Sequence, residues 1–146
     1  MLFRSNEYPQ TEKFVEAKLL LGQCYFFKKQ YLKAYETLQN LLSYDSYQDA
    51  TLFWLGETYL KGADFKQAEK QYKQLIQVHP NSIYVPQAYY SLGWTYFEQA
   101  KYEKAKEVFR ELIESNPGHQ LSEDAAFKLG EADYNLKNYE IGRAHV

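Results

Sequence analysis

Apolar residues recur along this chain at the three- and four-residue spacings of amphipathic helices, and short polar tracts interrupt them. The clearest example is residues 80–105, in which apolar positions on two helical faces flank the polar tract at residues 98–101. The marker positions of this stretch are Leu92, Gly93, Tyr96, Tyr102 and Ala105. Because the tract leaves room only for a tight turn, the pattern predicts a helical hairpin.

The same signature recurs along the chain. Its glycines, Gly22, Gly56, Gly93 and Gly130, are separated by 34, 37 and 37 residues, a period typical of stacked helix pairs. Glycine inside a helix costs about 1 kcal/mol relative to alanine. We therefore expect the missing Cβ atoms to let a neighbouring helix approach closely. Pro9, Pro80 and Pro117 each precede a glycine by 13 residues and are expected to end one helix pair before the next begins.

The expected helices can be given as ranges. The first repeat predicts helices over 11–27 and 31–42, with a turn at 28–30, and the second predicts helices over 47–60 and 65–78, with a turn at 61–64. The third repeat spans 83–115, with Pro86 in the first turn of its helix. Ser46 and Ser122 are expected to cap helices, the second of which ends near Lys137.

Two inward-facing stripes follow from the periodicity of the first repeat. On the first helix the expected stripe is Phe14, Ala17, Leu20, Leu21 and Cys24, and on the second it is Ala34, Leu38 and Leu41. The single cysteine cannot form an internal disulfide, so we expect it to be a small core side chain.

The marker residues carry a resemblance to a known family. The order of Tyr89, Leu92, Gly93, Tyr96, Ala105, Phe109 and Pro117 resembles the consensus of the tetratricopeptide repeat. The resemblance implies an all-α fold, a right-handed α-solenoid of stacked helix-turn-helix repeats. It divides a single array over residues 1–146 into a remnant of a preceding repeat (1–10), three repeats (11–43, 46–79 and 82–116) and the start of a fourth (122–140).

The 37-residue period indicates a particular group of these repeats. With Pro80, Asn81 and Ser82 before the helix, the repeat is similar to the repeats of bacterial outer-membrane assembly lipoproteins and of the periplasmic protein that coordinates the Tol-Pal system. A role in cell-envelope assembly and a periplasmic or outer-membrane-associated location are implied by this resemblance alone.

The last six residues break the pattern. Gly142 stands where the earlier repeats have Ala34, Ala68 and Ala105, and Ile-Gly-Arg-Ala-His-Val is also the translation, in one frame, of a common sequencing-library adapter. Our hypothesis is that residues 141–146 are not native and that the chain is a fragment of a longer protein.

Composition and charge exclude several function classes. With 17 basic and 19 acidic residues, a net charge of −2 and no basic stripe, the chain is not expected to bind nucleic acid. No apolar run is long enough to cross a membrane, so no direct membrane insertion is expected in this segment. His79, His119 and His145 lack a partner at ligand spacing, and no glycine-rich phosphate loop exists. We expect no metal, no cofactor and no enzymatic activity.

The resemblance also implies where a partner would bind. In tetratricopeptide repeats three columns face the concave groove: the residue three before the glycine, the one after it and the one four after it. The first column here is Leu19, Phe53, Tyr90 and Phe127, the second is Gln23, Glu57, Trp94 and Glu131, and the third is Phe26, Leu60, Phe97 and Tyr134. The predicted function is a protein–protein interaction scaffold that binds a peptide or partner protein in this aromatic groove.

Two interpretations of these aromatic residues stay open. They fill the interface between successive helix pairs, or Phe53, Tyr90, Trp94 and Phe127 form an exposed platform with Trp94 as its hot spot. A grip on a terminal carboxylate is not expected, because the matching positions are Leu19, Gln23, Trp54, Gln87 and Ser91. The alternatives are a regulatory repeat region of a larger enzyme or signalling protein, and self-association through uncapped ends.

Overall fold

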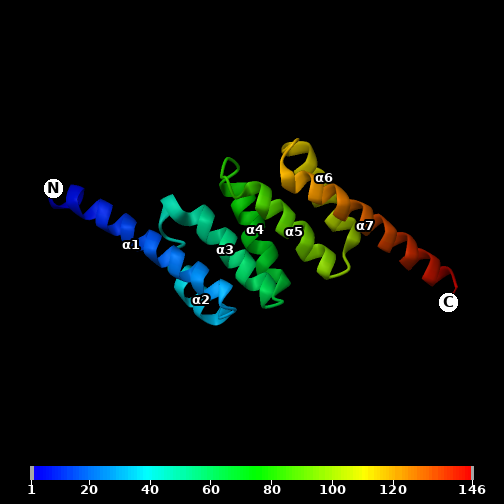
Figure 1. Ribbon diagram of the computed structural model, residues 1–146, viewed down its shortest axis with the longest axis horizontal. Coiled ribbons are helices and arrows are strands. Elements are labelled where there is room, and N and C mark those ends of the chain that lie inside the picture. The colour runs from blue at the N-terminus through cyan, green and yellow to red at the C-terminus, as the bar shows by residue number, and fades with distance from the viewer. Residues whose placement is uncertain (1, 146) are drawn as a thin grey trace. The chain divides into compact units, whose positions relative to one another are not determined.

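The chain folds into helices joined by short turns. The computed structural model describes the backbone of residues 2–145 and the side chains of residues 11–145. This part of the chain contains seven α-helices, one short 3-10 helix and no strand. Figure 1 traces it from α1 in blue to α7 in red. Its contacts divide into two compact units, Met1–Gln71 and Tyr72–Val146, and the boundary lies inside α4 (Phe65–Val78).

The first unit is built on a hairpin of α1 (Leu2–Phe27) and α2 (Tyr31–Gln39). The short helix η1 (Asp45–Tyr47) leads into α3 (Gln48–Lys61), which packs on α2 and contacts α1. The core of this unit includes Val15, Leu19, Leu38, Leu41, Leu52 and Leu55, all buried.

The second unit contains α5 (Val85–Glu98), α6 (Tyr102–Ser115) and α7 (Gln120–Ala144). α6 packs on both α5 and α7, and α5 also contacts α7. Its core includes Leu92, Tyr96, Phe109, Leu112, Ala125 and Ala132. Pro86 occupies the first turn of α5, as predicted, where its missing N–H leaves no hydrogen bond unmade.

The three hairpin turns share one backbone device. Lys29, Ala63 and Ala100 adopt left-handed conformations with φ of 61°, 59° and 56°. After each, the next amide donates to the carbonyl five residues back, at 2.9 Å in all three turns (Gln30 to Tyr25, Asp64 to Tyr59, Lys101 to Tyr96). This is a Schellman motif, which satisfies the last carbonyls of a helix while reversing the chain. The predicted turns at 28–30, 61–64 and 98–101 are confirmed.

Two of the four repeating glycines lie in the close contact that their spacing predicts. A Cβ added to Gly22 would lie 2.5 Å from Cδ2 of Leu38, and one added to Gly93 would lie 2.7 Å from Cδ1 of Phe109. Leu38 and Phe109 are fully buried, so neither has space to move aside. At Gly130 the prediction is wrong, because no atom lies within 4 Å of the added Cβ.

The reason for the difference at Gly130 is the length of α7. This helix runs past Lys137 to Ala144, so no second helix folds back on it among the described residues, and the predicted end near Lys137 is wrong. Lys137 lies one repeat of 37 residues after Ala100, which turns the chain between α5 and α6. Lys137 itself lies inside α7 and makes no turn. The predicted break at Pro9 is wrong as well, because α1 continues through it. A proline deletes one helical hydrogen bond, and the helix continues on the others.

The two predicted serine caps are also wrong. Ser46 lies within η1, and α3 begins after Tyr47 without a side-chain cap. α7 begins after His119, whose Nδ1 accepts a hydrogen bond from the N–H of Leu121 at 3.1 Å. Ser122 is buried and donates instead to the carbonyl of Asn116 at 2.7 Å. α2 ends at Gln39 rather than residue 42, although Leu41 is buried as expected.

The predicted buried stripe of α1 is wrong. Phe14, Ala17, Leu20, Leu21 and Cys24 are exposed, and the buried positions are Val15, Leu19 and Gly22. The buried set lies on the opposite side of the helix, since residue 24 is about half a turn from residues 15, 19 and 22. Both sides are apolar, and the docking of α2 decides which one is buried. On α2 itself, Ala34, Leu38 and Leu41 are buried as predicted.

Replacing glycine by alanine should have opposite effects on stability at Gly93, which is in close contact, and at Gly130, which is not. Gly93→Ala should lower the free energy of unfolding by about 1 to 2 kcal/mol, because the clash with Phe109 outweighs the gain in helix propensity. Gly130→Ala meets open space and should raise it by up to about 1 kcal/mol. Urea unfolding followed by circular dichroism measures both, and equal effects at the two sites would contradict the role assigned to Gly93.

Replacing alanine by glycine should stabilise the protein at a left-handed turn residue and destabilise it inside a helix. Ala100→Gly removes the strain of a positive φ and should raise the free energy of unfolding by about 1 kcal/mol. Ala105→Gly, five residues on in the buried interior of α6, should lower it by about 1 kcal/mol or more. The same urea titration tests the pair, and a destabilised Ala100→Gly variant would show that this turn is not strained.

Candidate functional site: an aromatic surface on α5 and α7

Residues of two helices in the second unit form an aromatic surface. We define it as Tyr90, Trp94 and Phe97 of α5 with Phe127, Lys128 and Glu131 of α7. The rings of Trp94 and Phe97 are stacked, with centroids 5.7 Å apart and planes 10° from parallel. Phe97 in turn meets the edge of Tyr102 at 5.2 Å. Packing on α6 therefore holds the stacked pair in place.

Lys128 connects the two helices of this surface. Its Nζ lies 4.5 Å from the ring centroid of Trp94, 5.4 Å from that of Phe97 and 5.9 Å from that of Phe127. The same Nζ lies 2.5 Å from Oε2 of Glu131, one helical turn further along α7. A cation over an aromatic face is attracted by the negative charge density of the ring. The ammonium group is thus held by three rings and one carboxylate.

Tyr90 and Phe127 differ in their accessibility. The ring of Tyr90 packs 5.9 Å from that of buried Phe109. Burial raises the pKa of the Tyr90 hydroxyl, Asp124 and Glu131 add to this rise, and Lys128 opposes it. Phe127 is 68% exposed. Tyr90 is therefore anchored in the unit, while Phe127 projects into solvent.

The predicted groove residues of the first unit lie in different surroundings. Leu19 and Phe53 are only 7% and 9% exposed, so they belong to the core. Gln23 and Glu57 are half-buried. Phe53 packs against Trp54, whose ring also meets Phe26 and Phe27 at 5.5 and 5.6 Å. In this unit the first column fills the interior instead of forming a platform.

The third column is also divided. Phe26, Leu60 and Phe97 are half-buried, and the two phenylalanines make ring contacts within their own units. Tyr134 is 67% exposed. Packing inside a unit therefore accounts for Phe26 and Phe97, but not for Tyr134.

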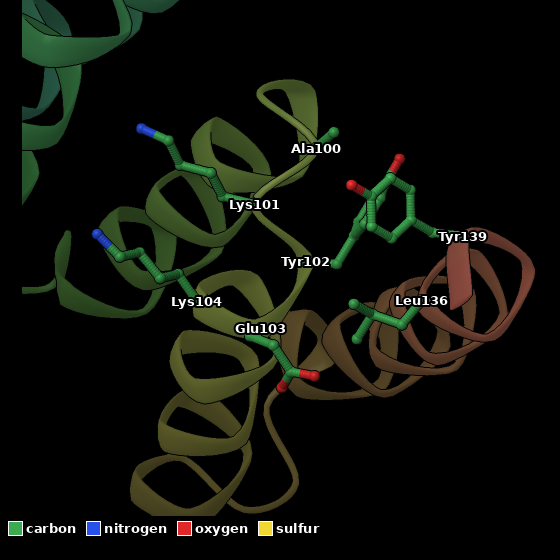
Figure 2. Close-up of a pocket in the computed structure, with 7 residues that line it drawn as sticks. All are labelled: Ala100, Lys101, Tyr102, Glu103, Lys104, Leu136 and Tyr139. Carbon is green, nitrogen blue, oxygen red and sulfur yellow. The ribbon is translucent and has the colours of Figure 1, made fainter. Parts of the chain in front are cut away.

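A cavity of about 590 Å³ lies elsewhere in the second unit, between the start of α6 and the C-terminal half of α7. Figure 2 shows Tyr102, Leu136 and Tyr139 at this cavity, while Lys101 and Lys104 extend away from them. None of the predicted groove residues lines this cavity. Its lining combines Ala100, Tyr102, Leu136 and Tyr139 with the charged residues Lys101, Glu103 and Lys104.

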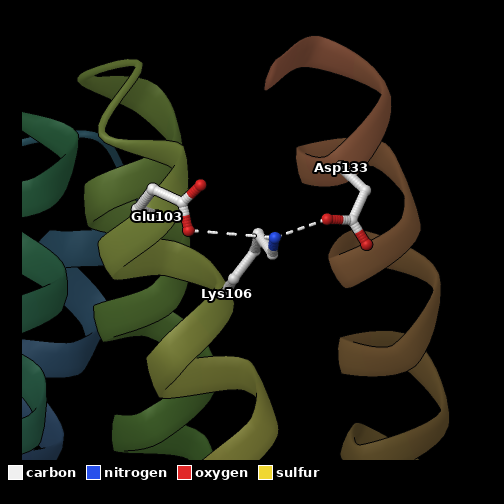
Figure 3. A network of polar contacts seen from close by, with 3 residues as sticks. All are labelled: Glu103, Lys106 and Asp133. Carbon is white, nitrogen blue, oxygen red and sulfur yellow. Dashed lines mark ion pairs between the residues drawn. The ribbon is translucent and has the colours of Figure 1, made fainter. Parts of the chain in front are cut away.

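An ion-pair network holds α7 against α6. Nζ of Lys106 lies 2.5 Å from Oδ1 of Asp133 and 3.8 Å from Oε2 of Glu103 (Figure 3). The hydrogen bond from Lys106 lowers the pKa of Asp133. Lys106 is only 13% exposed, so its charge is largely shielded from water. The network helps to place Phe127, Lys128 and Glu131 opposite α5.

Sequence reasoning missed Lys106, Lys128 and Asp133. The sequence did contain a signal for Lys128. It follows the predicted groove residue Phe127 and lies three positions before Glu131, a spacing that allows an ion pair on one helix. In the part of the chain that the structure describes, no group of histidine, cysteine or acidic residues has the arrangement of a metal site. None of the described helices combines the length and the apolar character needed to span a membrane.

Comparisons with known proteins agree with this helical architecture. Sequence profiles described as tetratricopeptide repeats match residues 16–46 and 47–117. The chain is similar to the Sgt2 TPR domain from Aspergillus fumigatus, with a TM-score of 0.73 and 21% identity over 88% of this chain and 83% of that one. No curated protein sequence matches it.

Two further solved structures have the same fold. The Arabidopsis OM64 TPR domain matches with a TM-score of 0.69 and 18% identity, over 80% of this chain and 94% of that one. The second TPR domain of human RPAP3, solved with an HSP70 peptide, matches with a TM-score of 0.67 and 21% identity, over 80% and 92%. The predicted fold class, all-α with helix-turn-helix repeats, is confirmed.

The lowered pKa of Asp133 predicts how stability depends on pH. Its charged form is favoured by folding, so its contribution is present above the ordinary aspartate pKa of about 3.9 and is lost as the pH falls through the lowered value. Asp133→Asn should therefore unfold at a lower urea concentration than wild type at pH 7, and the difference should shrink as the pH falls below the ordinary aspartate pKa of about 3.9.

The control for this variant is Glu103→Gln. Its carboxylate is farther from Lys106 and 71% exposed, so its removal should have a smaller effect. A difference between wild type and Asp133→Asn that stays constant with pH would mean that the ion pair does not contribute.

Proposed function

Because the chain belongs to the tetratricopeptide-repeat family, we propose that it is a protein–protein interaction scaffold whose aromatic surface on α5 and α7 binds a segment of a partner polypeptide. Trp94 is the centre of this contact, and Tyr90 and Phe127 are further contact residues. The chain itself supplies no chemistry in this proposal, since binding requires only the surface.

The stacked and half-buried Trp94 is the observation that carries the proposal. It contacts both Phe97 and Lys128 on ordered helices, so little conformational entropy would be lost when a partner covers it. Tryptophan in such a setting is typical of interface hot spots. Phe127 offers additional exposed apolar area next to it.

The human RPAP3 domain, solved with an HSP70 peptide, supports peptide binding as a use of this fold. The ligand proposed here differs, because the positions expected to grip a terminal carboxylate carry no lysine, arginine or asparagine. They are Leu19, Gln23, Trp54, Gln87 and Ser91. An internal segment of a partner is therefore favoured over a terminal carboxylate.

The finer parts of the sequence prediction stay predictions. The solved structures reported above share the fold and carry no information on a role in bacterial cell-envelope assembly or on a periplasmic location. The same scaffold would serve a regulatory region of a larger enzyme or signalling protein.

Self-association through uncapped ends is the other alternative. It would be measured by analytical ultracentrifugation over a range of protein concentrations.

Selection from a library of random linear peptides displayed on phage tests the proposal. Peptides enriched on the wild-type chain should bind Trp94→Ala about thirty-fold more weakly, corresponding to about 2 kcal/mol for a hot spot. Phe14→Ala is the control, because this aromatic residue is 55% exposed on α1, outside the aromatic surface. It should bind like wild type.

Circular dichroism of each variant separates lost binding from lost folding. The proposal fails if no peptide is enriched, or if enriched peptides bind wild type and a folded Trp94→Ala variant equally.

A further inference from the structure

The environment of Lys128 has the chemistry of a cation-binding box. The rings of Trp94, Phe97 and Phe127 surround its ammonium group at 4.5, 5.4 and 5.9 Å, and the carboxylate of Glu131 closes the box at 2.5 Å. Several aromatic faces converging on one cation form the arrangement that proteins use to recognise ammonium groups. Here the chain's own lysine occupies it.

We propose that this box is a cation-binding subsite, that Lys128 is its resident occupant, and that the partner inserts a lysine or arginine flanked by apolar residues in place of Lys128. This inference rests on the proposed function, because it names the class of polypeptide that the aromatic surface recognises. The resident lysine keeps the box filled until a partner side chain replaces it.

Lys128 is held in a way that allows it to leave. Its ion pair with Glu131 joins neighbouring turns of one helix, and the side chains of Lys128 and Glu131 are 19% and 38% exposed. Pairs between neighbouring turns of one helix are weaker than pairs that join separate elements when one partner is solvent-exposed, as Glu131 is here. Phe127 is 68% exposed, so one wall of the box is open to solvent. The lysine stem is long and flexible, and its ammonium is readily hydrated outside the box.

The walls of the box would keep their shape after Lys128 leaves. Trp94 and Phe97 stack on each other, and Phe97 also packs against Tyr102 of α6. The face of Trp94 that Lys128 now covers would then be available to another cation. The α5 wall of the box, formed by Trp94 and Phe97, is therefore preorganised. The group that is replaced, the ammonium of Lys128, comes from α7.

The surrounding charges favour a basic partner over an acidic one. Asp124 and Glu131 of α7 both act on the Tyr90 hydroxyl, and Lys128 is the cation that opposes them. Once Lys128 has moved into solvent, the two carboxylates and the aromatic faces remain. A lysine or arginine of the partner restores the lost pairing, whereas a glutamate in the same place would face like charges.

Three matched synthetic peptides test the inference. Each has blocked ends and the same apolar flanking residues, with lysine, norleucine or glutamate at the central position. Binding to the full chain is followed by the indole N–H signal of Trp94 in a nitrogen-15 correlation spectrum, assigned by its loss in Trp94→Phe. We expect the lysine peptide to bind about fivefold more tightly than the norleucine peptide and the glutamate peptide to bind most weakly.

Variants of the box distinguish replacement from simple attraction. Lys128→Gln removes the competing occupant and should increase affinity for the lysine peptide about fivefold, whereas Glu131→Gln should reduce it. Lys128→Met also removes the ammonium group, and it guards against an effect of glutamine on the folding of α7. Lys104→Gln is the matched control, because Lys104 lies over Tyr96 at 5.6 Å, outside the box, and this variant should bind like wild type.

The outcomes separate this inference from the proposed function. Binding of all three peptides with equal affinity, or weaker binding of the lysine peptide to both Lys128 variants, overturns the cation subsite while leaving a peptide-binding surface. If no peptide perturbs the Trp94 signal, the subsite fails. If the display selection is also empty, the proposed function fails with it.

Discussion

The structure depends on the close approach of the two helices in a hairpin at a glycine. In the first hairpin Leu38 of α2 packs onto Gly22 of α1, and in the third Phe109 of α6 packs onto Gly93 of α5. In both pairs the large side chain is completely buried, so the glycine determines how near the helices come and about which point they cross. The left-handed residue of each turn then reverses the chain so that this contact forms.

The glycine contact also decides which side of α5 faces outward. With Gly93 against Phe109, the neighbouring Trp94 lies at the border of the packed face, where it is half-buried and contacts α7 through Lys128. The position of α7 has its own determinant, the ion pair between Lys106 and Asp133. The glycine contact and this ion pair are both made by residues outside the aromatic surface.

The aromatic surface combines apolar rings with one charged side chain, that of Lys128. Burial of Lys128 among the rings of Trp94, Phe97 and Phe127 shields them from water, and the exposed carboxylate of Glu131 compensates its charge. An apolar patch covered by a mobile, charged side chain stays soluble without a partner. In the proposed function the same side chain moves aside when a partner arrives, so protection of the surface and recognition by it rest on the same residue.

The sequence alone determined the helical class, the repeat period and the turns, because spacing and turn length are local properties of the chain. It also predicted the close contacts at Gly22 and Gly93, since a repeated glycine in a helix implies a neighbouring backbone or side chain. It could not determine burial. Leu19, Phe53 and Phe127 occupy the same column of the repeat, yet the first two are core residues and the third is exposed.

Only the tertiary structure decided such differences, because burial depends on which neighbours dock against a helix and not on the helix's own pattern. α1 has two apolar sides, and the docking of α2 selects Val15 and Leu19 over Phe14 and Leu20. The contact at Gly130 is missing because α7 continues where an earlier helix turns. The role of Lys128 arises only when α7 lies beside α5, which places one ammonium group near rings that are more than thirty residues away along the chain.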